Sequence, residues 1–457
     1  MIGKHQIEID WRNFVKGMSS SAEIADGGFS PDTDNVNLTK IPGVLYAPAL
    51  SSDADTDDRL STTISIIASS PDMATIMADR RLLVGVNASE DGTFFRYDGT
   101  KIIAAAYATD TTRNYGKGFT DIITFGGEAY VTSKSHIARW QNDNTITQDF
   151  FAFITTTVFH PALVFENNAY YGDGNTLKRA TAINTAPTTI LTLSTDQIIT
   201  ALGTDPSTGY MLISVTSTFD ASNTGTGVHK VMWYDGYSNK VRKSIVVEDL
   251  ITAFHVNSGT VFVGYGQNIG YLTGGGINFL RKLKNVGLDS NELPFKHNFT
   301  SIGNTTYVLD DYQVLAFGKI LPSSPPVFYY AYSNSITAAG STTTLTFLSN
   351  GGSGRLLISQ AGQLHHFDTT SVATTNTMSF YTNIYNFPRP VYLRGAYVQY
   401  VDAVDTASSI RNLRHSTQTR AERLANVFGG TSLNSVPGTV YEITDVVLTL
   451  QMFLKKR

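Results

Sequence analysis

The sequence predicts an all-β fold, a six- or seven-bladed β-propeller, and three observations lead to this prediction. Thr, Val, Ile, Tyr and Phe dominate, and Gly, Asn, Asp and Ser interrupt them at short intervals, as in strands joined by turns. Convincing helical periodicity is nearly absent before residue 410. A hairpin pattern also recurs at the spacing of propeller blades.

The composition excludes several classes of protein. The chain has 457 residues, of which 42% are hydrophobic, so it can bury a sizeable core. Its 34 Lys and Arg against 38 Asp and Glu give a net charge of −4, which excludes a strongly basic nucleic-acid binder. It has no cysteine, which excludes a disulfide scaffold, a Cys-ligated metal site and thiol catalysis. No signal peptide or run of about 18 apolar residues appears, so we expect a soluble chain made in a cytoplasm.

The repeat is clearest in the segments that begin at Asp121 and Pro161. Phe125 matches Phe165, Tyr130 matches Tyr170 and Ile137 matches Leu177, each pair 40 residues apart. Every copy is an apolar strand, a short polar turn and a second strand, which is a hairpin signature. Further copies begin at Ile251, Phe299 and Gly354, and looser ones at Arg81 and Tyr210.

Equivalent positions in the middle of these hairpins are 46, 40, 43, 49, 45 and 50 residues apart, and four-stranded blades occupy about 40 to 50 residues. The alternative is a β-sandwich with coincidental spacing. A propeller also explains why only 16% of residues are charged, because blade faces bury against neighbouring blades. The equivalent positions are Val84, Tyr130, Tyr170, Ile213, Phe262, Tyr307 and Leu357. Further strands are expected at Ile64 to Ala68, Gln197 to Leu202 and Val241 to Val247.

The two ends of the chain depart from the repeat, and we expect the propeller at residues 51–376. Residues 1–50 are rich in Gly and Pro yet too apolar for a free tail, so they predict an extended N-terminal arm laid along a protein surface. Residues 377–457 predict a small C-terminal β module with one short helix. The expected helix is Thr417 to Phe428, and the expected final strand is Val440 to Leu454.

Charge is divided unequally between these parts. Residues 389–457 hold nine Lys or Arg and five Asp or Glu, a net of +4, which leaves −8 for residues 1–388. Four arginines gather around the expected helix, and their common role is a solvated helix face. We assign them to a protein interface rather than to DNA. They are Arg411, Arg414, Arg420 and Arg423.

No catalytic, cofactor-binding or metal site is predicted. The turn at Ser89 to Phe94 is one residue short of a sialidase Asp box and occurs once, so a plain turn is favoured. The acidic run at Asp53 to Asp58 lacks the Gly and the bidentate Glu of a calcium loop. His365 and His366 are adjacent, so they point to opposite faces of a strand. The run Gly274 to Gly276 predicts a turn between strands.

Two sequence segments, called phrases below, resemble segments of a known protein family. Gly28 to Val44 combines a Gly-aromatic-Ser start, an Asn-Val pair and a Pro-Gly-hydrophobic end, with Ile41 where the family usually has Arg. Thr377 to Tyr400 places Tyr, Thr, Phe, Pro, Arg, Val and Tyr in the family's order. Flanking a propeller-length repeat, these phrases resemble tail and portal-vertex proteins of tailed bacteriophages. The matching residues are Gly28, Phe29, Ser30, Asn35, Val36, Leu38, Pro42, Gly43 and Val44, then Tyr381, Thr382, Phe387, Pro390, Arg394, Val398 and Tyr400.

The resemblance implies a non-enzymatic virion protein, a nozzle, hub or adaptor ring around the genome-delivery channel. It implies a homo-oligomeric ring, neighbouring tail or portal-vertex proteins as partners, genomic DNA passing without specific binding, and no cofactor. The expected location is the virion tail, after synthesis in the host cytoplasm. We expect interactions through Trp11, Phe14 and Phe29 of the arm and through the four arginines.

Two alternatives come from other functional classes. One is a receptor- or carbohydrate-binding propeller at a tail tip, in which Tyr97, Trp140 and Trp233 would stack on sugars. The recurrence of these aromatics at blade positions favours core packing instead. The other alternative is a glycan hydrolase, which the missing Asp boxes and the lack of a clear carboxylate pair disfavour. The segment Ser217 to Val228 interrupts one hairpin and is expected to be either a binding loop or inert padding.

Overall fold

The computed structural model divides the chain into two compact units, residues 1–386 and 387–457. All described residues belong to the first unit, and the described side chains lie between residues 121 and 329. The described residues are 33–34, 48–52, 64–69, 82–86, 92–93, 96–97, 102–103, 109–110, 121–132, 135–141, 146–155, 160–217, 227–283, 296–310, 313–319, 321–332, 344–350, 353–360, 363–372 and 379–380.

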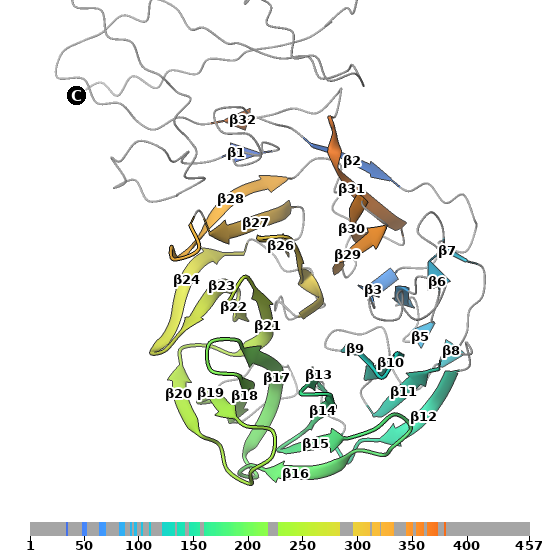
Figure 1. The fold of residues 1–457 in the computed structure, drawn as a ribbon, viewed down its shortest axis with the longest axis vertical. Helices are drawn as coiled ribbons and strands as arrows, with labels where there is room; N and C mark the ends of the chain where they lie inside the picture. The colour runs from blue at the N-terminus through green and yellow to red at the C-terminus, as the bar shows by residue number, and fades with distance from the viewer. Residues whose placement is uncertain are drawn as a thin grey trace, which may run out of the picture. The chain divides into compact units, whose positions relative to one another are not determined.

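The body of the first unit is built from antiparallel sheets of four strands (Figure 1). Five of these sheets each contain four strands that are consecutive in the chain. The first two sheets are β9 (Ile122–Phe125), β10 (Glu128–Thr132), β11 (His136–Trp140) and β12 (Ile146–Ala152), then β13 (Ala162–Phe165), β14 (Asn168–Asp173), β15 (Thr176–Ala180) and β16 (Thr188–Thr192). The third is β17 (Gln197–Asp205), β18 (Tyr210–Ser217), β19 (His229–Tyr234) and β20 (Lys243–Val247). The fourth and fifth are β21 (Ile251–Asn257), β22 (Thr260–Tyr265), β23 (Asn268–Thr273) and β24 (Gly276–Lys282), then β25 (Phe299–Ile302), β26 (Thr305–Asp310), β27 (Gln313–Lys319) and β28 (Pro326–Tyr332).

A sixth four-stranded sheet joins the two ends of the unit. Three of its strands are consecutive, β29 (Thr344–Asn350), β30 (Ser353–Gln360) and β31 (Gln363–Val372). Its outer strand is β2 (Pro48–Ser52), which pairs antiparallel with β31. A two-stranded sheet of β3 (Ile64–Ser69) and β4 (Leu82–Val86) follows β2 in the chain. The remaining described strands are short pairs, β5 (Gly92–Thr93) with β8 (Thr109–Asp110), β6 (Arg96–Tyr97) with β7 (Ile102–Ile103), and β1 (Thr33–Asp34) with β32 (Ser379–Phe380).

Burial decreases from the inner strands of a sheet to its fourth strand. Every residue of β10 and of β22 is buried, because both faces of these second strands are covered. The fourth strands β16 and β20 are mainly exposed. Figure 1 shows the fourth strands toward the outside and the first strands toward the inside. The low charge of the chain follows from the covered inner strands, since a buried charge is costly without a partner.

Tight turns join the first and second strands. In the β13–β14 turn, Glu166 and Asn167 have φ of 45° and 57°, and in the β21–β22 turn Ser258 and Gly259 have φ of 48° and 72°. Positive φ at both central residues is the mark of the two-residue hairpin turns that match strand twist. Asn and Gly adopt this region at low cost, which explains their frequency at these places.

Consecutive sheets pack face to face around shared hydrophobic clusters. The first strands of neighbouring sheets also contact each other in the order β9, β13, β17, β21, β25, β29 and β3. Tyr130 and Tyr171 lie in the cluster between the first two sheets, and Phe262 and Phe317 lie in the cluster between the fourth and fifth sheets. Sheets that stack radially, each covering the face of the next, make this an all-β, propeller-like fold.

The structure confirms the predicted all-β, propeller-like class. All seven predicted equivalent positions, from Val84 to Leu357, lie in the second strand of a sheet. The strands expected at Ile64 to Ala68 and Gln197 to Leu202 are β3 and part of β17, and the third expected strand overlaps β20. Gly274 and Gly275 form the predicted turn between β23 and β24. The expected helix at Thr417 to Phe428 and the expected final strand lie outside the described residues.

Candidate functional site

The predicted interaction residues lie outside the described part of the chain. These are Trp11, Phe14 and Phe29 of the arm and Arg411, Arg414, Arg420 and Arg423 near the C-terminus. The acidic run at Asp53 to Asp58 also lies outside it, as does most of the Asp-box-like turn. The described polar side chains therefore decide what chemistry the body of the protein can support.

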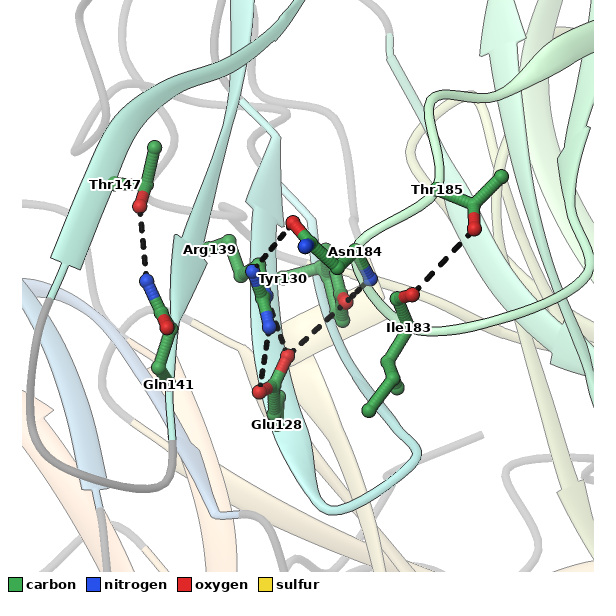
Figure 2. A network of polar contacts seen from close by, with 8 residues as sticks. All are labelled: Glu128, Tyr130, Arg139, Gln141, Thr147, Ile183, Asn184 and Thr185. Atoms are coloured by element: carbon green, nitrogen blue, oxygen red, sulfur yellow. Dashed lines mark hydrogen bonds and ion pairs between the residues drawn. The ribbon is translucent and has the colours of Figure 1, made fainter.

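A buried ion pair stands at the junction of the first two sheets (Figure 2). Arg139 on β11 donates through Nε and Nη2 to the two carboxylate oxygens of Glu128 on β10, at 2.5 and 2.8 Å. Its Nη1 donates to Oδ1 of Asn184, in the β15–β16 loop of the next sheet, at 2.7 Å. The Tyr130 hydroxyl donates to Glu128 and accepts the backbone N–H of Asn184. Burial raises the pKa of Tyr130, so the hydroxyl keeps its proton.

The same arrangement recurs one sheet later, which makes it part of the repeat. Tyr170 and Arg179 are cross-strand partners on β14 and β15, as Tyr130 and Arg139 are on β10 and β11. Both side chains donate to the carbonyl oxygen of Gly236, in the β19–β20 loop of the following sheet, at 3.2 Å each. We call each Tyr and Arg pair a Tyr–Arg clamp, because each holds the loop of the next sheet.

Cations also bridge the next two junctions between sheets. Lys243 on β20 donates to the carbonyl oxygen of Gly274, in the β23–β24 turn, at 2.6 Å. Arg281 on β24 lies over the ring of Phe328 on β28, with 4.3 Å between Cζ and the ring centroid. At all four junctions, therefore, a cation of one sheet reaches the following sheet. These side chains tie each sheet to the following one, while the buried Nε of Arg179 has no hydrogen-bond partner among the described residues.

A series of hydrogen-bonded polar side chains links β21 to β25 and β26. His255 on β21 shares a hydrogen bond of 2.6 Å between Nε2 and the Ser301 hydroxyl on β25. The Ser301 hydroxyl also contacts the Thr306 hydroxyl, which accepts a hydrogen bond from Asn257. Burial first, and then the positive charge of Lys296, lowers the pKa of His255 to about 4. A half-buried, neutral histidine beside a hydroxyl that is already hydrogen-bonded serves packing between two sheets.

The structure corrects the candidate sugar-stacking residues. Trp140 is 1% exposed and Trp233 is 4% exposed, so neither ring can stack on a ligand at the surface. The indole N–H of Trp233 donates to Asp205 at 2.8 Å, inside the same sheet. The side chain of Tyr97 is outside the described residues. Core packing of both tryptophans, the reading favoured by their recurrence, is confirmed.

Other sequence candidates gain no ligand-binding chemistry from the structure. Among the described side chains, His, Asp and Glu do not gather in groups of three that could hold a metal ion. No helix within the described ranges has the length and apolar character to cross a membrane. The interrupting segment does fall between β18, which ends at Ser217, and β19, which begins at His229, but most of it lies outside the described residues.

Sequence reasoning missed the Tyr–Arg clamps, although a signal was present. Arg139 and Arg179 are 40 residues apart, as Tyr130 and Tyr170 are. A charged residue repeated at this interval on a buried strand indicates an ion pair or a hydrogen-bonded cation. The partner loops carry no matching signal, because Asn184 and Gly236 are ordinary turn residues.

Comparison with known proteins gives likeness of structure only. No family model matches the chain, and no curated protein matches it. A chain from the crystal structure of BBS1N in complex with ARL6DN is 12% identical over 72% of this chain and 98% of that one, with a TM-score of 0.47. The extracellular domain of a putative hybrid two-component system, BT4673 from B. thetaiotaomicron, is 11% identical over 71% of this chain, with a TM-score of 0.45. This chain matches 40% of that second protein's length. Likenesses of this size carry no argument about function.

Proposed function

We propose that the protein is a non-enzymatic structural component of a bacteriophage tail, a nozzle, hub or adaptor subunit of a homo-oligomeric ring. In this proposal the sheets complete a seven-bladed propeller, with β3 and β4 belonging to the seventh blade. The arm and the C-terminal module contact neighbouring copies and adjacent tail proteins, and the genome passes along the ring. The proposed location of the protein is the virion.

The observation that carries the proposal is the pairing of β1 with β32. Thr33 lies opposite Phe380 and Asp34 opposite Ser379. These strands belong to the two phrases that resemble the phage tail proteins, Gly28 to Val44 and Thr377 to Tyr400. Phrases from opposite ends of the repeat region therefore meet in one small sheet. This supports a common module outside the four-stranded sheets, as expected if the phrases share an assembly role.

The chemistry of the body supports a structural role as well. Both arginines of the Tyr–Arg clamps donate a hydrogen bond to a loop of the neighbouring sheet, as in a scaffold. The turns of the described sheets present mainly Gly, Ser, Thr and Asn, which offer contacts of low charge. A ring of identical subunits requires surfaces that tolerate burial against other protein surfaces.

The test is the size and symmetry of the full-length chain in solution. Electron microscopy and light scattering are expected to find a closed ring of several copies. Trp11→Ala with Phe14→Ala is expected to reduce ring formation while leaving the circular dichroism spectrum of the folded chain unchanged. Arg242→Ala, on the exposed β19–β20 loop, is the control and should leave the ring intact. A purely monomeric particle at high concentration would overturn the proposal.

The two other functional classes have their own readouts. Binding of the chain on a glycan array would favour a receptor-binding propeller. Release of reducing sugar from a host polysaccharide would establish a hydrolase. Sugar binding is not expected, because the two candidate tryptophans with described side chains are buried. Hydrolysis is not expected, because the sequence lacks repeated Asp boxes and a clear carboxylate pair.

A further inference from the structure

A short turn immediately before β25 lies among strands of several sheets. It is the three-residue 3-10 helix η3 (Lys296–Asn298). Residues of η3 contact β21, β26, β29 and β3, which belong to four different sheets. Three of these, β21, β29 and β3, are first strands of their sheets and belong to the inner row. The Asn298 side chain is fully buried there.

The Lys296 side chain extends this contact to two more sheets. Its Nζ donates to Oδ1 of Asp121 at 2.9 Å and to the carbonyl oxygen of Ala162 at 3.0 Å. Asp121 directly precedes β9, and Ala162 is the first residue of β13. The ammonium group therefore binds where the first strands of two neighbouring sheets begin.

The Asp121 carboxylate is built to receive this lysine. Its Oδ2 accepts the backbone N–H of Ala162 at 2.8 Å, and its Oδ1 accepts the N–H of Ile122 at 2.7 Å. The side chain of Asp121 is 7% exposed and that of Lys296 is 31% exposed. A carboxylate that is this buried needs a counter-charge, and Lys296 supplies it from a distant part of the chain.

We propose that η3, with Lys296 bound to Asp121 and Ala162, is a plug that closes the centre of the propeller where its first strands begin. The plug joins the starts of β9 and β13 to β21, β29 and β3, and it leads directly into β25. It therefore fastens sheets that do not pack face to face.

The plug has a consequence that rests on the proposed tail function. A centre filled by a hydrogen-bonded turn leaves no passage for a DNA duplex through a single subunit. The genome would instead pass outside the propeller bodies, along a wall made by several copies. The propeller then acts as a solid block of the ring.

Lysine footprinting of the unmodified full-length chain tests the plug. An acylating reagent should modify Lys296 about tenfold more slowly than the exposed Lys240 and Lys282, since its hydrogen bonds must break first. Equal rates at the three lysines would overturn the plug. This measurement does not require any variant to fold.

Hydrogen exchange of variants tests the link between distant sheets. Lys296→Met should speed exchange of the backbone amides of Ile122 and Ala162 about tenfold, while β18 stays protected. Lys296→Arg keeps the charge and the donors and should restore most of the protection. Unchanged exchange at both amides in a folded Lys296→Met chain would refute the plug. Lys282→Met, on the exposed fourth strand of its sheet, is the matched control and should change neither amide.

The outcomes separate the plug from the tail function. A chain that forms rings but has an unprotected Lys296 would refute the plug alone. A monomeric chain with a protected Lys296 would refute the ring alone. A ring map with a duplex-wide opening through each propeller body would also overturn the plug.

Discussion

Removal of Arg139 is expected to destabilise the protein far more than removal of an exposed arginine. In Arg139→Met the carboxylate of Glu128, whose side chain is 6% exposed, loses two hydrogen bonds and its counter-charge. Among the described side chains, only the Tyr130 hydroxyl, at 3.2 Å, then still donates a hydrogen bond to this carboxylate. An uncompensated buried charge costs about 3 to 5 kcal/mol. Asn184 of the next sheet also loses its hydrogen-bond donor.

The assay is urea unfolding followed by fluorescence and circular dichroism. The double variant Glu128→Gln with Arg139→Met removes both charges, so it should recover more than half of the lost free energy. Arg242→Met is the matched control, because Arg242 is 58% exposed in its ion pair with Asp235 and should cost at most about 1 kcal/mol. A loss below about 1 kcal/mol in Arg139→Met would refute the reasoning, as would a double variant less stable than the single one.

Two further predictions concern packing and pH. The pKa of His255 is lowered from 6.5 to about 4 in the folded chain, so this histidine binds a proton more readily when the chain is unfolded. The stability that neutral His255 contributes is therefore fully present above pH 6.5 and is lost as the pH falls toward 4. The loss in unfolding free energy is up to about 3 kcal/mol. The measurement is the difference in unfolding free energy between wild type and His255→Gln, which should be smaller at about pH 4.5 than at about pH 7. An equal difference at both pH values would contradict the prediction. Gly203→Ala would place Cβ 2.5 Å from Cβ of Phe254 on the next sheet and should cost about 1 to 3 kcal/mol in thermal unfolding. Gly274→Ala has nothing within 4 Å and should change little, so equal effects of the two substitutions would count against the packing described.

The repeated hairpins were predictable because they rest on local chemistry. A turn with Gly or Asn, such as Ser258 and Gly259, must follow a strand and precede the next one, whatever the rest of the chain does. Buried aromatics such as Tyr130 and Tyr170 recur because each sheet presents the same face to its neighbour. Periodicity therefore carried the fold class and all seven second strands.

The contacts that close and fasten the structure were not predictable in the same way. The pairing of β2 with β31 depends on backbone groups, which carry no residue-specific signal. Lys296 and Asp121 are an ordinary lysine and aspartate in the sequence, 175 residues apart. Fourth strands such as Thr188–Thr192 look like loops, because one edge and most side chains face solvent.

The direction of the bridges between sheets bears on how the body unfolds. Arg139, Arg179, Lys243 and Arg281 all reach from one sheet to the one that follows it in the chain. Sheets that touched only neighbours would unfold in steps, as in linear repeat proteins. Here Lys296 adds a contact that skips sheets, since it ties the starts of β9 and β13 to a turn beside β21, β29 and β3. Loss of one sheet then removes partners from both its neighbours and the centre, which favours a single cooperative transition.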